Sequence, residues 1–576
     1  MPGASQTLVP LYRIIVGGGE LDPVEADAVH QIKITDFLRL PDVCTLQVGY
    51  PAEDGPDPFK NLDDSKFQVG VPLEVKLGGT DDRVTKSLFK GEIVTVEPDF
   101  QAGGASMVVR AYDWSHRMMR SRKQRTFVNV KISDIVRRVC QENGLSASVE
   151  DERGGPLETV VQNSESDWDF VWRLARRIGF ELTVNDRTAE FKPPQHSTPV
   201  ELAYPEHLHA FRPRITAVQQ VHTVNVRGFD SKTKRVAMGS ATRPRQVTEA
   251  GITRQQVRDE FPGAVIEIGG QAFKTQSEAT TIAQATLDQL ANAYLAAEGE
   301  CDGNPLIKAG TRIQISGVGR KYSGIYRVAK AVHMLTAGGY VTQFSNSAGE
   351  HTLLGQSGGA NGGPRRVDSI VVGIVTNNRD PEGLGRLKVK LPSVSEVETA
   401  WAPLLVASAG NERGIMMMPQ PGEQVLVAFE NGDPSYPVVL GSMFNGRDKA
   451  GDELLATKEN YDGSFAVKSD HRALIHTRED ITLHSDNGKW VVKLTGGEIQ
   501  ETVKQGAGGG GGYKGDFDGS WNLKATGGVT VESTGSVTVK APTIKVEASA
   551  SLELKAASVD INGSSVKISG GIINIG

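Results

Sequence analysis

From Trp521 to Gly576 the chain repeats a short pattern in which aliphatic and polar residues alternate. Alternation with a period of two puts the aliphatic side chains on one face of a strand and the polar ones on the other. A strand of four residues cannot bury such a face alone, so the pattern predicts short strands that stack on one another. Eight segments start six to eight residues apart, at Trp521, Val529, Val537, Ile544, Leu552, Val559, Val566 and Ile572.

A period this short indicates one strand and one corner per repeat, as in a β-helix. Eight repeats of a three-sided coil would give one chain fewer than three turns, which is fewer than repeat proteins usually need for stability. Three intertwined chains would instead supply strands to every face of a triangular prism and bury the aliphatic faces inside it. The predicted trimer core consists of Val529, Val531, Val537, Val539, Ile544, Val546, Leu552, Leu554, Val559, Ile561, Val566 and Ile568.

An ordinary β-sandwich is the alternative fold for this stretch. It would need longer strands and hairpin turns such as Asn-Gly at regular sites, which the stretch lacks. The charged residues between the aliphatic ones would lie outside the prism and keep it soluble. We therefore expect residues 515–576 to form a trimeric β-helix spike.

Length and composition are those of a globular protein with several domains. The chain has 576 residues and a formal net charge of −6, so a general nucleic-acid or membrane-surface binder is not indicated. Cys44, Cys140 and Cys301 lie far apart and match no metal or redox spacing, which predicts buried thiols in a reducing compartment. The first residues show no basic region followed by an apolar core, so we expect synthesis in the cytoplasm without a signal peptide.

The region from Leu8 to Ser347 has the pattern of one large α+β region. Short alternating segments separated by Gly, Asp and Pro predict strands. They cover residues 28–36, 73–78, 89–97 and 106–111.

Two helices stand out in this region. Ile132, Ile135, Val136, Val139 and Cys140 share one helical face, and Gly144 follows them. The second helix is expected to begin at a capping box of Ser164 and Asp167 and to end at Gly179. Its buried side would carry Trp168, Val171, Ala175 and Ile178.

The second helix lies in a segment that resembles a known family. Ser164-Glu-Ser-Asp-Trp-Asp-Phe-Val-Trp-Arg-Leu-Ala-Arg-Arg-Ile-Gly-Phe is similar to a signature of the VgrG (valine-glycine-repeat protein G) spike proteins of type VI secretion systems and related phage tails. Gly324-Ile-Tyr-Arg-Val-Ala-Lys-Ala-Val-His-Met and Gly339-Tyr-Val-Thr-Gln-Phe resemble the end of the family's hub domain. The resemblance implies a hub over residues 1–353, with two β-barrel-like domains that form a pseudo-sixfold ring as a trimer and dock on a hexameric tail tube.

A second domain is expected after a Gly-rich linker at residues 354–364. The segments Ile370-Val-Val-Gly-Ile-Val-Thr and Gly385-Arg-Leu-Lys-Val-Lys-Leu-Pro, joined through Asp380-Pro-Glu-Gly, predict a hairpin. With further short strands up to residue 450 they suit a small five-stranded barrel, an OB-fold, and they closely resemble the OB-fold of VgrG. Connecting strands and a Gly-rich segment at residues 451–514 then lead to the spike.

Nucleic-acid binding is disfavoured for the OB-fold. Residues 365–450 contain nine Lys and Arg against ten Asp and Glu, so a basic groove is missing. The one basic cluster of note is more typical of a solvated face, or of a contact with an acidic neighbouring subunit, than of a nucleic-acid site. It consists of Arg117, Arg120, Arg122, Lys123 and Arg125.

Catalytic and metal motifs are weak. Gly355-Gln-Ser-Gly-Gly matches a nucleophile elbow by letter only, because it lies in the Gly-rich linker. His471, His476 and His484 have no HExxH or paired-Cys motif beside them, and Asp516-Phe-Asp-Gly lacks the closing Glu of a calcium loop. We therefore predict no catalytic, cofactor or metal site, and no enzyme.

Together these patterns predict a mainly β protein that forms a homotrimer, and the resemblance to the VgrG family implies that it is the central spike of a contractile injection system. The partners that the resemblance implies are the inner tube protein, baseplate components, effector cargo, and a tip protein of the proline-alanine-alanine-arginine (PAAR) type. The tip protein would cover the apolar end of the prism at Ile572, Ile573 and Ile575. A β-helical tailspike or adhesin that binds or degrades polysaccharide is the alternative, although the rod lacks the expected carboxylate pairs and aromatic platforms.

Overall fold

The computed structural model divides the chain into two compact units, Met1–Lys468 and Ser469–Gly576. It describes most of residues 11–347 and 370–450, single residues and short runs between 467 and 515, and residues 520–575. Outside the description within the first two stretches lie residues 53–58, 79–84, 102–103, 152–154, 196, 231–233, 246–247, 270–274 and 394. The predicted linker at 354–364 and most of the predicted connecting segment at 451–514 also lie outside the described residues.

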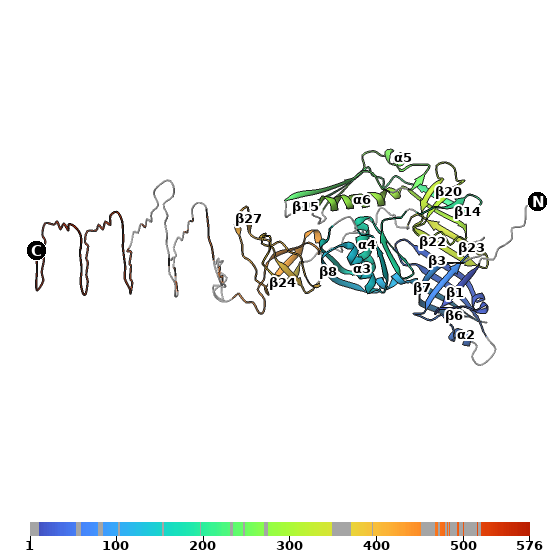
Figure 1. The fold of residues 1–576 in the computed structure, drawn as a ribbon, viewed down its shortest axis with the longest axis horizontal. Coiled ribbons are helices and arrows are strands. Elements are labelled where there is room, and N and C mark those ends of the chain that lie inside the picture. The colour runs from blue at the N-terminus through green and yellow to red at the C-terminus, as the bar shows by residue number, and fades with distance from the viewer. Residues whose placement is uncertain are drawn as a thin grey trace, which may run out of the picture. The chain divides into compact units, whose positions relative to one another are not determined.

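An eleven-stranded sheet forms the body of the first unit (Figure 1). The strands that the alternating segments predicted are confirmed: β3 and β5 are shifted by one residue, and β6 and β7 are wider than predicted. Strands from the two ends of the predicted hub meet in the middle of this sheet, where Ile34 of β3 lies opposite His333 of β22. The order is β14 (Leu208–Ile215), β19 (Leu295–Asp302), β23 (Gly339–Ser345), β22 (Lys330–Thr336), β3 (Val29–Phe37), β4 (Val43–Pro51), β7 (Gly104–Asp113), β6 (Lys86–Gln101), β5 (Pro72–Leu77), β1 (Tyr12–Val16) and β2 (Gly19–Glu20).

Smaller elements cover the ends of this sheet. One core lies under β1 to β7 with the short helices α1 (Pro23–Asp27) and α2 (Lys60–Asp63), and another lies around β19 and a four-stranded sheet. That sheet has the order β13 (Val200–Ala203), β20 (Arg312–Ser316), β21 (Gly324–Arg327) and β17 (Glu249–Ala250).

Both predicted helices form, and they pack against each other beside β8 (Figure 1). They are α3 (Ile132–Glu142) and α4 (Asp167–Ile178), and Gly179 ends α4 in the left-handed conformation, as predicted. The predicted capping box of Ser164 and Asp167 is wrong. Ser166 caps α4 by accepting a hydrogen bond from the Asp169 N–H, because the helix begins at Asp167 and Ser164 lies two residues too early.

The rest of this core comes from short strands and a 3₁₀ helix. β8 pairs with β10, and β12 lies between β11 and β9. The bounds are η1 (Trp114–Met119), β8 (Arg122–Val130), β9 (Ser146–Val149), β10 (Leu157–Ser166), β11 (Glu181–Asn185) and β12 (Thr188–Lys192).

A third helical layer was not predicted from the sequence. The long helix α6 (Gln276–Asn292) covers a three-stranded sheet and buries Ala279, Ala283 and Leu287 against it. The sheet has the order β16 (Arg235–Ala241), β15 (Thr223–Asp230) and β18 (Val265–Ile268), and the short helix α5 (Arg254–Asp259) lies between β17 and β18 in the chain.

Residues 371–442 form the predicted five-stranded OB-like sheet. Its order is β26 (Ser395–Glu398), β25 (Lys388–Leu391), β24 (Val371–Asn377), β29 (Gln424–Phe429) and β30 (Pro437–Ser442). The predicted turn between β24 and β25 is held by Asp380, whose carboxylate accepts hydrogen bonds from the backbone of Leu384 and from the backbone and side chain of Arg386. A small hairpin of β27 (Ser408–Gly410) and β28 (Arg413–Ile415) and the short η2 (Glu430–Gly432) complete the described elements of this domain.

The prediction of a mainly β protein is confirmed. In the second unit, the described residues of one chain form a series of separate bends, to which neither helix nor strand is assigned (Figure 1). Among the helices that the structure describes, none combines the length and apolar character needed to cross a bilayer.

Candidate functional site

The twelve residues predicted to form the trimer core are all exposed in the single chain. Their exposed fractions run from 51% for Val559 to 72% for Val531, whereas Ile34 in the hub sheet is 1% exposed. Soluble monomers rarely leave so continuous an apolar surface in water. A single copy therefore leaves the aliphatic side chains of its repeats exposed to water.

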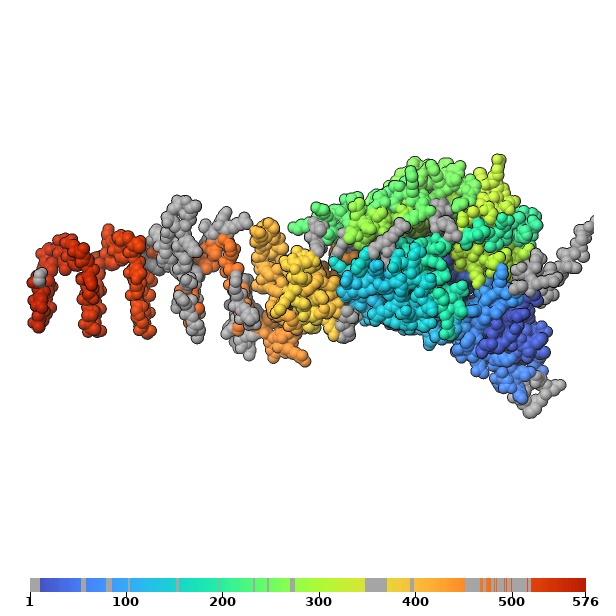
Figure 2. Space-filling model, in the orientation of Figure 1, coloured from blue at the N-terminus to red at the C-terminus, as the bar shows by residue number. Residues whose placement is uncertain are grey.

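The exposure follows the repeat. In each of the six pairs the first aliphatic residue is less exposed than the second, as in Val529 and Val531 or Val566 and Ile568. In Figure 2 the described residues after 520 form columns that are joined at one end and have open space between them. The repeats thus have one common local geometry but do not pack on each other within one copy.

The three residues predicted to bind a tip protein are exposed as well. Ile572 and Ile575 are 86% and 87% exposed, and Ile573 is 47% exposed. Ile573 and Ile575 continue the alternation into the last described repeat, and Ile572 precedes them directly. Nothing else in the described part of the chain covers them.

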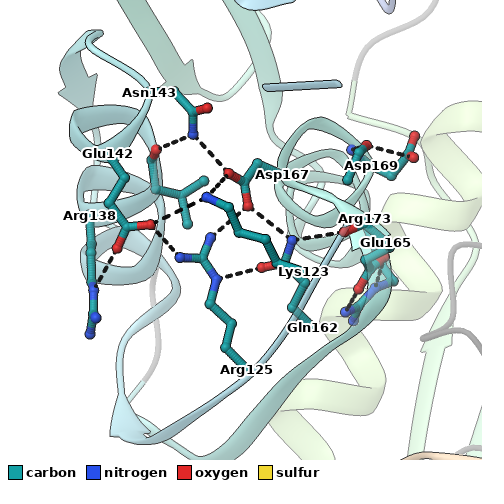
Figure 3. A network of polar contacts seen from close by, with 12 residues as sticks. Lys123, Arg125, Arg138, Glu142, Asn143, Gln162, Glu165, Asp167, Asp169 and Arg173 are labelled. Carbon is teal, nitrogen blue, oxygen red and sulfur yellow. Dashed lines mark hydrogen bonds and ion pairs between the residues drawn. The ribbon is translucent and has the colours of Figure 1, made fainter. Parts of the chain in front are cut away.

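Two members of the predicted basic cluster, Lys123 and Arg125, pair with acidic residues inside the first unit (Figure 3). Lys123 donates to Asp167 at 2.7 Å, and Arg125 donates to the other oxygen of Asp167 at 2.6 Å. Arg125 also pairs with Glu142, while Arg117 donates to both carboxylate oxygens of Glu92. Arg117, Arg120 and Arg122 are exposed, in line with the expected solvated face, whereas Lys123 and Arg125 are half-buried against acidic partners from the same chain.

Asp167 is the centre of this polar network. Its side chain is 1% exposed and also accepts hydrogen bonds from Asn143 at 2.8 Å and Gln162 at 3.0 Å. Burial alone would raise the pKa of this carboxyl, but the hydrogen bonds from Lys123, Asn143 and Gln162 outweigh burial and lower it. The network ties β8, β10 and both helices together, so its role is structural.

The helix of the resemblance segment also anchors the OB-like domain. Arg177 near the end of α4 pairs with Glu278 of α6, and its side chain is only 19% exposed. Although burial alone would lower it, the charges of Glu278, Tyr436 and Asp433 raise the pKa of the Arg177 guanidinium. The side chain thus joins α4 and α6 to the loop of the OB-like domain before β30.

Apolar contact accompanies this junction. Val161 of β10 belongs to the core of the OB-like domain, together with Val389 and Val427, and its N–H donates to the Ser435 hydroxyl at 3.3 Å. Arg173, one helical turn before Arg177, donates to the Val161 carbonyl at 2.9 Å and pairs with Glu165. Glu278 and Ser435 were missed from the sequence because their partners lie more than 100 residues away.

A buried carboxylate cluster lies beside the end of β3. Asp42 donates its N–H to Asp113, and the Phe37 N–H donates to Asp42. Burial raises the pKa of Asp36 and of Asp113 to about 6, with Lys308 partly opposing the shift at Asp36. Burial and the neighbouring charges of Asp36 and Asp113 raise the pKa of Asp42 too.

The weak catalytic and metal candidates gain no support from geometry. His476 is exposed, while His471, His484, Gly355-Gln-Ser-Gly-Gly and Asp516-Phe-Asp-Gly lie outside the described residues. Over the part of the chain that is described, no group of three or more His, Cys, Asp or Glu side chains is arranged to hold a metal ion. The three cysteines are buried, as predicted, and burial raises the pKa of the Cys140 and Cys301 thiols to about 12.

Known proteins resemble this chain over most of the first unit. Residues 10–337 match the family model described as the Alg8 N-terminal domain, and residues 371–444 match the type VI secretion system/phage-baseplate injector OB domain. The chain is 24% identical to the type VI secretion system spike protein VgrG1b of Pseudomonas aeruginosa over 61% of its own length and 51% of that protein. It is 23% identical to VgrG1c of the same organism over 73% of its own length and 64% of that protein.

The chain spans 51% of the length of VgrG1b and 64% of the length of VgrG1c. Among solved structures, it is similar to an Escherichia coli component of the type VI secretion system that is described as structurally similar to T4 bacteriophage tail proteins gp27 and gp5. The identity is 14% and the TM-score 0.44, over 72% of this chain and 96% of that one.

Proposed function

This chain belongs to the family of the Alg8 N-terminal domain and is a VgrG-like spike protein, and we propose that three copies wind together to form the central spike of a contractile injection particle. The observation that carries the proposal is the exposure of the twelve aliphatic residues between Val529 and Ile568. Burying them is favourable by about 1.5–3 kcal/mol for each side chain. Two further copies supply the surface that does this.

A triangular prism fits this stretch better than a sheet added to the first unit. Each aliphatic pair is followed by a corner of Gly, Ser, Ala, Thr or Pro, so the chain can turn after every strand. About eight strands on each face, spaced by ~4.8 Å, would make a rod of roughly 40 Å. In such a rod every strand has neighbours on both sides except at the two ends, which protects its edges from other chains.

The proposed role is mechanical. The first unit would join the inner tube and the baseplate, the rod would point toward the target, and sheath contraction would drive both forward with any attached effector. Interlocked chains resist force because they must unwind together, so the useful measure of their stability is a slow unfolding rate. Arg177 and its partners would hold the OB-like domain to the hub under that load.

The end of the rod is proposed to bind a cone-shaped tip protein of the PAAR type. Three copies would bring together three sets of Ile572, Ile573 and Ile575, all of them exposed in the single chain. Apolar side chains gathered and exposed in this way need a cover. The particle carrying the spike would be assembled in the cytoplasm and act outside it.

Co-purification with the inner tube protein tests this function. We expect the full-length chain to bind tube rings of the native host and to appear at the front of contractile particles in electron micrographs. A protein found only on the outside of particles or cells, with no tube in the same fraction, would instead support the adhesin alternative.

A further inference from the structure

The outward face of the repeats carries an ordered series of charges. The fourth residue of five successive segments alternates in sign: Lys524, Glu532, Lys540, Glu547 and Lys555. All five side chains are exposed in the single chain. The spacing between these residues changes from eight to seven and back to eight. The sign of the charge nevertheless changes with every segment, so the pattern depends on the position within the segment and not on a fixed residue spacing.

The geometry of three wound chains determines which of these residues become neighbours. Each copy moves to the next face of the prism with each repeat, and at any height the three copies occupy the three faces. If the three copies start at the same height, the strand stacked on repeat n of one copy is repeat n+1 of another copy, and both run in the same direction. If one copy slips by one repeat, the strand stacked on repeat n at one of its contacts is repeat n+2 instead. Residues at the same place in the two strands then lie about 4.8 Å apart on the same outer face.

At an offset of one repeat, every neighbour in this series has the opposite charge. Glu532 of one copy would lie beside Lys540 of the next, and Glu547 beside Lys555. At an offset of two repeats, Glu532 would lie beside Glu547 and Lys540 beside Lys555. Opposite charges on adjacent strands are favourable, and like charges are unfavourable.

The other outward position, the second residue of each segment, is less regular. Lys545 and Glu553 have opposite charges one repeat apart, and so have Asp560 and Lys567, but Glu553 and Asp560 have the same charge. Within a single copy, Lys545 forms an ion pair with Glu547 of its own segment. The register information is therefore concentrated in the fourth residue of each segment.

We propose that the charge series Lys524, Glu532, Lys540, Glu547 and Lys555 sets the register between neighbouring copies at one repeat. The aliphatic core alone does not do this, because the repeats have similar inward side chains and a slipped register would bury them equally well. This inference rests on the proposed threefold winding. In it the aliphatic side chains hold the three copies together, and the outward charges decide which repeats lie side by side.

Cysteine pairs test the register in the full-length protein. In the variant Glu532→Cys/Lys540→Cys, dibromobimane should bridge residue 532 of each copy to residue 540 of the next, giving a covalent trimer on a denaturing gel. The matched control Glu532→Cys/Glu547→Cys should give little bridged product. The native thiols compete weakly, since all three are buried.

Each result of this experiment has one meaning. Covalent trimer from the 532/540 pair alone supports the proposal. Trimer from the 532/547 pair, or none from either pair in a protein that has the mass of three copies, overturns the register. A folded protein with the mass of one copy overturns the threefold winding itself, and bridges within single chains would accompany it.

Charge reversal gives an independent readout. Lys540→Glu places three acidic residues in adjacent strands, and we expect the unfolding rate of the trimer to rise on the order of tenfold or more. Reversing all five charges restores the alternation and should restore most of the lost kinetic stability. If the single reversal and the complete reversal unfold at the same rate, or neither differs from the parent protein, the charges do not set the register.

Discussion

Truncating one aliphatic side chain of the repeats should destabilise the proposed spike far more than expected for a side chain that is exposed in a single copy. Leu554 is 68% exposed in the single chain. Truncating an exposed side chain to Ala changes the free energy of unfolding by about 0.5 kcal/mol or less. If Leu554 is instead buried in the core of three copies, Leu554→Ala costs about 2–5 kcal/mol at each site. Three sites bring the expected loss to roughly 6–15 kcal/mol per trimer.

Urea unfolding of the full-length protein, followed by light scattering to record the loss of trimer mass, measures this change. Thr538→Ala is the matched control, since Thr538 lies on the outward face of the same unit and should cost less than about 1 kcal/mol. A Leu554→Ala protein that unfolds at the same urea concentration as the control would show that this residue is not in a core, and would refute the reasoning behind the prism.

Three further predictions concern other parts of the chain. Burial raises the pKa of Asp36 to about 6, so the folded state binds the carboxyl proton more tightly than the unfolded state. The protonated carboxyl therefore stabilises the folded state below about pH 4, and this contribution is lost as the pH rises through 6. Asp36→Asn should therefore add about 2–3 kcal/mol at pH 8 and little at pH 4, and equal effects in urea titrations at both pH values would contradict this. Arg177→Met leaves Glu278 without its cation and should cost about 2–4 kcal/mol in urea unfolding, whereas Arg138→Ala on an exposed helix face should cost less than about 1 kcal/mol. Ending the chain after Ser569 should abolish binding of the tip protein in a pull-down while the trimer mass is kept, and retained binding would remove the isoleucines from that role.

Local elements were predictable where periodicity and end signals agreed. The apolar face of α3 and the Gly179 end of α4 identified two helices, because Gly is the residue best suited to a left-handed helix end. Helix α6 was missed because its buried face consists mostly of Ala, which gives a weak contrast with the polar face. The start of α4 was misplaced by two residues because Ser164 and Ser166 both suit a helix cap, and in the structure the helix begins only at Asp167, directly after Ser166.

Long-range partners were beyond the reach of the sequence. The ion pairs of Arg125 could not be predicted, because its acidic partners, Glu142 and Asp167, lie 17 and 42 residues away in the chain. The pairing of β3 with β22 likewise joins segments about 300 residues apart. The need of the terminal repeats for neighbouring strands could be predicted from one chain, because a short repeat cannot bury its aliphatic face alone.

The mass of the purified full-length protein in solution tests the threefold winding most directly. Sedimentation at micromolar concentration should give a single species of three copies, close to three times the 61.8 kDa of one chain. A stably folded species with the mass of one chain, with protease-resistant residues 520–575, would contradict it.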